Sequence, residues 1–134
     1  MNDNVTITGK DYSIIAVGNG STVIGGDGST LTGGDSSKVT GGKRSVVTGG
    51  DRSTVTGGDG SKVIGGDYSM VIGGGNSMVY GGVGSVVTGG MGSTLIVEYW
   101  GGNEYTRMVV GYVGEDGIKP DVPYHVVEGR LVNL

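Results

Sequence analysis

The sequence predicts an all-β fold, namely a β-solenoid (β-helix) with 16-residue coils made of two octapeptides, plus a small C-terminal β cap. Serine recurs at a spacing of eight, without a break, from Ser13 to Ser93, and an aliphatic residue stands two positions after each serine. A Gly-Gly pair stands in every octapeptide between residues 25 and 90. Together these three observations indicate a short strand and a corner in each octapeptide.

Each octapeptide follows the pattern Ser-x-Val-x-Gly-Gly-Asp-x, whose first four positions alternate with a period of two. This alternation places serine and valine on one face of a strand. We expect Gly-Gly-Asp to form the corner, because glycine reaches positive φ freely and aspartate tolerates turns. Such a short strand buries little alone, so the octapeptides must stack as coils with two opposed sheets. The inward serine hydroxyl then needs a partner, either the serine one coil away or a corner carbonyl.

The repeat divides the chain into three segments: residues 1–12 as an N-terminal cap or first partial coil, residues 13–96 as the solenoid, and residues 97–134 as the C-terminal cap. In the cap, residues 105–113 and 123–127 are predicted to form two strands separated by the turn-rich residues 114–117. The first twelve residues lack the apolar run of a signal peptide. No stretch approaches the roughly 18 apolar residues that a membrane span needs. We therefore expect no membrane span and synthesis in the cytoplasm.

Composition and charge argue against several classes of function. The chain contains no cysteine, which excludes disulfides and thiolate metal sites. Its formal net charge of −4 argues against a nucleic-acid partner, because such proteins present a basic surface to the phosphates. The single histidine, His125, falls in the predicted cap, and the repeat offers no general base beside its serines. We therefore expect no enzyme activity, no cofactor and no metal site.

Aspartates mark the predicted corners, and we interpret them as turn-forming residues. A calcium-binding ladder is the alternative, but its repeats have a period of nine and a second aspartate, which these octapeptides lack. Stacked carboxylates repel one another, and the nearby Arg44 and Arg52 are expected to offset this repulsion. The sequence places Asp27, Lys43 and Asp59 in one corner column and Asp35, Asp51 and Asp67 in the other.

The positions one and three residues after each serine face outward and differ between repeats. Regular Thr-x-Thr pairs could order water on an ice-like spacing, so Thr30, Thr32, Thr54 and Thr56 are the candidate ice-binding residues. Apolar outward residues gather in the last third of the repeat, where a monomer would expose an unusual apolar area. We predict a homo-oligomer contact there, with coverage by the C-terminal cap as the alternative. The candidate interface residues are Met70, Ile72, Met78, Tyr80, Val86 and Met91.

The octapeptides at residues 26–33 and 50–57, Gly-Asp-Gly-Ser-Thr-Leu-Thr-Gly and Gly-Asp-Arg-Ser-Thr-Val-Thr-Gly, resemble the repeats of bacterial ice-nucleation proteins. The tail resembles the terminal cap of that family. In that family a long water-organising stretch carries Thr-x-Thr, and a shorter block beside the cap carries basic and mixed residues and is linked to assembly into fibres. This chain is more similar to the second block. The matching tail residues are Trp100, Gly102, Tyr105, Gly114, Glu115, Gly117, Pro123 and Tyr124, and the basic residues within the octapeptides are Lys38, Lys43, Arg44, Arg52 and Lys62.

Three functional hypotheses follow from the sequence. The first is a non-catalytic, self-assembling structural solenoid that resembles the C-terminal part of ice-nucleation proteins and associates through its outward apolar residues. The second is a small ice-binding or ice-nucleating protein that acts through its Thr-x-Thr pairs on an ice or water surface. The third is a rigid scaffold or decoration protein of phage or bacterial origin.

Overall fold

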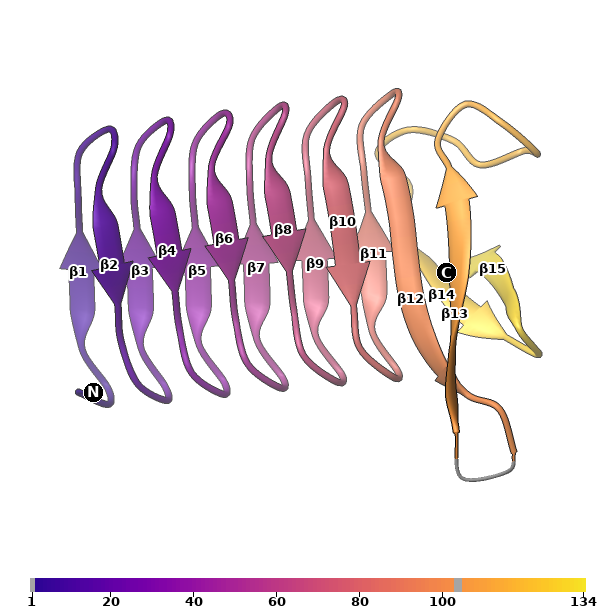
Figure 1. The fold of residues 1–134 in the computed structure, drawn as a ribbon, viewed down its shortest axis with the longest axis horizontal. Helices are drawn as coiled ribbons and strands as arrows, with labels where there is room; N and C mark the ends of the chain where they lie inside the picture. Colours follow the sequence, from indigo (N-terminus) through magenta and orange to yellow (C-terminus); the bar gives the residue numbers. More distant parts are fainter. Residues whose placement is uncertain (1, 103–104) are drawn as a thin grey trace.

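The computed structural model describes residues 2–102 and 105–134, and within these ranges the regular secondary structure consists of strands alone. Two sheets face each other along a rod, with the C-terminal strands gathered at one end (Figure 1). The first sheet contains, in spatial order, β1 (Thr6–Thr8), β3 (Thr22–Ile24), β5 (Lys38–Thr40), β7 (Thr54–Thr56), β9 (Met70–Ile72), β11 (Val86–Thr88), β14 (Tyr124–Val127) and β15 (Arg130–Asn133). The second contains β2 (Ile14–Ala16), β4 (Thr30–Thr32), β6 (Val46–Thr48), β8 (Lys62–Ile64), β10 (Met78–Gly81), β12 (Thr94–Trp100) and β13 (Thr106–Tyr112).

Stacking in the rod is parallel and in register with the repeat. Thr54, for example, lies beside Lys38 of the preceding coil and Met70 of the following one, each sixteen residues away. The aliphatic residues two positions after the serines form the core between the sheets, and all of them from Val23 to Leu95 are 0 % exposed. Each such side chain contributes roughly 1.5–3 kcal/mol by leaving water. The predicted fold class, an all-β solenoid with 16-residue coils, is confirmed.

The repeat serines, from Ser21 to Ser93, are also buried. Each mid-rod hydroxyl has two roles, as Ser61 illustrates. Its Oγ accepts a hydrogen bond from the backbone N–H of Ser45 in the preceding coil (3.2 Å) and donates one to the carbonyl of Gly42 at a corner (3.1 Å). Both partners that the sequence suggested, the serine one coil away and a corner carbonyl, are therefore used. In the described part of the chain, no buried side-chain polar atom is left without a partner.

The Gly-Gly pairs are required for space, and the expectation that they supply positive φ is wrong. A Cβ on Gly57 would lie 2.6 Å from Cγ2 of Val63, and one on Gly58 would lie 2.9 Å from backbone atoms of the preceding coil. Neither glycine has a positive φ. The left-handed residue of each corner stands instead immediately before the serine, as at Arg44 (φ 52°) and Gly60 (φ 68°). The spacing of glycines indicated a corner correctly but could not separate a conformational need from a close approach.

The corner aspartates link neighbouring coils. Oδ1 of Asp35 accepts a hydrogen bond from the backbone N–H of Asp51, and Oδ1 of Asp51 accepts one from Asp67, both at 2.9 Å. In the other corner column, Oδ1 of Asp27 accepts the N–H of Lys43 at 2.8 Å. Each carboxylate therefore bonds to a backbone donor of the next coil, so these residues stabilise the stacking as well as the turn.

The cap extends both sheets with strands of reversed direction. β12 runs straight on beyond the point where β10 turns, and β13 pairs with it in an antiparallel hairpin from Thr94↔Tyr112 to Trp100↔Thr106. In the first sheet, β14 lies antiparallel beside β11, with Tyr124 opposite Val87, and β15 completes a second hairpin. Strands β13 and β14 correspond to the two that the sequence predicts in the cap, whereas β15 was missed.

Replacing Ser61 with alanine should lower the free energy of unfolding by about 1–3 kcal/mol, because the buried N–H of Ser45 loses its acceptor. Lys62→Ala is the matched control, since that neighbouring side chain is exposed on the outer face. It should change stability by no more than about 0.5 kcal/mol. Urea denaturation followed by circular dichroism measures both. Equal losses in the two variants would contradict the role assigned to the serine.

A pair of glycine variants tests the corner. Gly58→Ala should destabilise the rod strongly, because its Cβ meets backbone atoms of Gly42 and Lys43 that cannot move without separating two coils. Gly60→Ala should cost only about 1–2 kcal/mol for a left-handed alanine, because the nearest atom, Cγ of Arg44, is 3.4 Å away. Thermal unfolding of both variants ranks them. A larger loss for Gly60→Ala would restore the conformational explanation of the glycine pair.

Candidate functional site

The predicted interface residues do not lie on one surface. The outward side chains of alternate octapeptides belong to opposite sheets, so the set is divided by the two-sheet architecture. Met70 and Ile72 (β9) and Val86 (β11) lie on the outer face of the first sheet, Met78 and Tyr80 (β10) lie on that of the second, and Met91 lies at a corner. The structure therefore brings together Met70, Ile72 and Val86 on one side and Met78 with Tyr80 on the other.

The cap leaves the three methionines of this set exposed, whereas Ile72, Tyr80 and Val86 are half-buried. Met70, Met78 and Met91 remain 49 %, 44 % and 59 % exposed. The reason is that β13 and β14 join the ends of the two sheets and do not fold back over their outer faces (Figure 1). The cap therefore enlarges each outer face and leaves its apolar residues in contact with water.

The enlargement produces one continuous apolar surface on the second sheet. In the β12–β13 hairpin, Val110 lies opposite Ile96 and Tyr112 opposite Thr94, so their side chains share a face with Met78 and Tyr80 of β10. We call this surface the outer apolar face and define it as Met78, Tyr80, Ile96, Met108, Val110 and Tyr112. The three cap residues of the set, Met108, Val110 and Tyr112, are 60 %, 49 % and 51 % exposed.

The cap part of the outer apolar face was not among the predicted interface residues. The sequence signal existed: in residues 106–112 the apolar Met108, Val110 and Tyr112 occupy alternate positions of a predicted strand. What the sequence did not contain was the antiparallel register with β12, which decides that this alternation faces outward. The neighbouring Arg107, Val109 and Gly111 lie on the opposite face of the strand, where Gly111 is buried, Val109 is half-buried and Arg107 is exposed at the cleft.

Tyr80 brings a hydrogen-bonded polar group to the outer apolar face. Its hydroxyl donates a hydrogen bond to the carboxylate of Glu98, which lies on the same face beyond Ile96. Burial raises the pKa of the Tyr80 phenol to about 12, and the hydrogen bond to Glu98 and the negative charges of Glu98 and Asp67 act in the same direction. The phenol is therefore neutral under all ordinary conditions, and it ties β10 to the projecting end of β12.

The candidate ice-binding threonines are separated by the same architecture. Thr30 and Thr32 lie on β4 of the second sheet, whereas Thr54 and Thr56 lie on β7 of the first. Along its sheet, the Thr54 column continues with a lysine on one side and a methionine on the other. Thr30 stands between Ile14 and Val46. These four residues therefore do not place two Thr-x-Thr pairs on adjacent coils of the same sheet.

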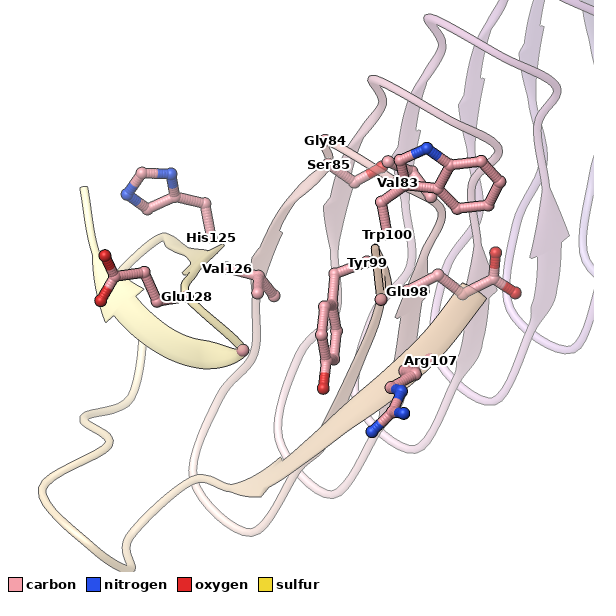
Figure 2. A pocket seen from close by; sticks show the side chains of 12 residues that line it. Val83, Gly84, Ser85, Glu98, Tyr99, Trp100, Arg107, His125, Val126 and Glu128 are labelled. Carbon is pink, nitrogen blue, oxygen red and sulfur yellow. The ribbon is translucent and has the colours of Figure 1, made fainter. Parts of the chain in front are cut away.

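A cleft of about 610 Å³ lies where the end of the β12–β13 hairpin projects past the corner at residues 83–85. Figure 2 shows Tyr99 inside it, with His125 and Glu98 on opposite sides of the tyrosine in this view. Across the described ranges, no hydrogen bond joins His125 to a hydroxyl or carboxylate, and no three acidic, histidine or cysteine residues are placed to hold a metal ion. The charged and aromatic residues that line the cleft are Glu98, Tyr99, Trp100, Arg107, His125 and Glu128.

Comparisons with protein-family models, with curated protein sequences and with solved structures find no match to this chain. No helix in residues 2–102 or 105–134 has the length and apolarity to cross a membrane.

The phenol of Tyr80 should ionise near pH 12, well above the ordinary pKa of 10.0. Because the folded pKa is raised, the neutral Tyr80 stabilises the fold below about pH 10, and this contribution is lost as the pH rises from 10 toward 12. Glu98→Gln should lower this pKa, since it removes the carboxylate charge. Phenolate absorbance of the parent, Glu98→Gln and Tyr80→Phe chains measures the step, which must be absent from Tyr80→Phe.

Proposed function

We propose that this protein is a non-catalytic, self-assembling structural β-solenoid that resembles the C-terminal part of ice-nucleation proteins. The single observation that carries the proposal is the outer apolar face, where side chains from β10, β12 and β13 stand together in water. Monomeric proteins rarely expose a large contiguous apolar surface, and such surfaces usually contact another macromolecule. The contact is made by outward-facing apolar residues at the cap end of the second sheet.

The position of this face supports assembly over a role in the fold. Met108, Val110 and Tyr112 are exposed although the core between the sheets is complete without them. Burial of these side chains against a partner would lower the free energy of the complex by roughly 25 cal/mol for every Å² of apolar surface removed from water. Farther from the cap, the same sheet carries polar residues at the corresponding positions, Lys62 and Thr30 among them. Ile14 and Val46 are also exposed on this sheet, but Thr30 and Lys62 separate them from each other and from the cap, so the apolar residues form a cluster only at the cap end.

The resemblance to ice-nucleation proteins points to the same function. It is carried by the octapeptides, by the tail and by basic residues within the repeat, features that in that family accompany the block linked to fibre assembly. The cleft beside the cap does not favour catalysis, because its ionisable side chains are not joined into a nucleophile and base pair. The threonines do not favour an ice-binding face, since their pairs lie on opposite sheets.

The double variant Met108→Lys/Val110→Lys should abolish self-association, because it introduces two charges on the outer apolar face. The matched control is Met70→Lys/Ile72→Lys, which makes the same change at the cap end of the opposite sheet and should leave association intact. Sedimentation velocity over a concentration series measures both, with circular dichroism to confirm folding. A parent chain that stays monomeric at high concentration would refute the proposal. If only the control variant dissociates, the contact lies on the first sheet.

A further inference from the structure

The two sheets end in four edge strands, and one of them differs from the rest. β1 and β2 have three residues each and β15 has four, whereas β13 has seven. Proteins usually protect sheet edges from pairing with other chains by keeping them short, or by placing proline or charges on them. β13 has no proline and only one charged residue, Arg107. It is therefore a long, unprotected edge, and it borders the outer apolar face.

The unpaired backbone groups of this edge follow from its register with β12. The N–H of Val113 donates to the carbonyl of Ser93 at 2.9 Å, so the residues of β13 with odd numbers form the hydrogen-bonded pairs of the hairpin. Bonded and non-bonded pairs alternate in an antiparallel ladder. The N–H and C=O groups of the even-numbered residues, such as Met108 and Val110, therefore point away from β12 toward the free edge. Within the described residues, no further strand pairs with them.

We propose that a second copy of this chain pairs with β13 through its own β13, antiparallel and about a two-fold axis at Val109. The inference rests on the proposed function and adds to it a main-chain contact along the edge of the outer apolar face. In this register the whole strand is used: Thr106 lies opposite Tyr112 of the copy, and Met108 opposite Val110. Both are pairs of even-numbered residues, so the N–H and C=O groups that point to the edge meet those of the other copy. The carbonyl of Tyr112 is the exception, because it accepts a hydrogen bond from the N–H of Glu115 at 3.1 Å.

The strand is complementary to itself in this register. The only charge of the strand, Arg107, lies opposite Gly111 of the copy, so two guanidinium groups do not oppose each other. On the other side of the ladder, Met108, Val110 and Tyr112 contact apolar or threonine partners, which reduces their exposure. The outer apolar faces of the two molecules become one continuous surface across the junction. A different protein would need a strand with the same alternation of side chains, whereas a second copy of this chain already contains that strand.

Single cysteines test this geometry sharply, because the chain contains none. Val109→Cys places the two sulfurs on either side of the two-fold axis, in a non-bonded pair whose Cα atoms lie about 4.5 Å apart, within the span of a disulfide. Met108→Cys is the matched control, since its two copies would be offset by two residues and lie about 8 Å apart, too far for a disulfide. Under mild oxidation, Val109→Cys should form a covalent dimer and Met108→Cys should not.

A second variant tests the hydrogen bonds of the edge without adding charge. Val110→Pro removes an N–H that faces the free edge and leaves the bonds to β12 in place. It should weaken dimerisation by roughly tenfold or more, because each copy loses a donor at the junction. Far-ultraviolet circular dichroism and thermal unfolding verify that the rod is intact.

The outcomes separate the two proposals. Cross-linking of Val109→Cys together with weakened association of Val110→Pro supports edge pairing. If the parent chain associates but Met78→Cys or Met108→Cys cross-links in place of Val109→Cys, the faces pack on each other, so edge pairing is wrong and the proposed function stands. A parent chain that remains monomeric in sedimentation refutes both.

Discussion

Close stacking of one coil on the next is the constraint on which the rest of this structure depends. Each corner must approach the previous one so nearly that a Cβ on the second glycine of a pair would meet backbone atoms. At that spacing the strands form continuous parallel ladders, and the serine hydroxyl spans from a donor in one coil to a corner carbonyl. The short distance between successive coils thus explains three features of the repeat: the glycine at the corner, the inward serine and the aspartate at the turn.

Because stacking is determined by the inward and corner residues, the outward positions are free to vary from coil to coil. This separation explains how lysine, threonine and methionine follow one another in a single column without disturbing the register. It also explains why function must be sought on the outer faces and in the cap. The cap residues complete an apolar surface that the repeat alone only begins, and they place it at the end of a rigid rod.

The period of eight predicts the fold in detail, because buried serine and valine recur with a regularity that only stacked coils satisfy. The same period predicted the hydroxyl partners of Ser61 but misjudged Gly58, since a sequence does not distinguish a residue needed for positive φ from one needed for lack of a side chain. In the cap there is no repeat to fix register. Met108 and Val110 therefore could not be assigned to a face, and β15 was missed because only its pairing with β14 makes it a strand.

The alternation of successive octapeptides between two sheets also governs how such a molecule can change its length. Gain or loss of a full coil preserves the identity of both faces, and each remaining coil keeps equivalent neighbours. Gain or loss of a single octapeptide would instead exchange the two faces on one side of the event, so residues that shared a surface would end on opposite sides. Duplication in this architecture therefore conserves a surface only in units of sixteen residues, the coil period seen in its strand pairing.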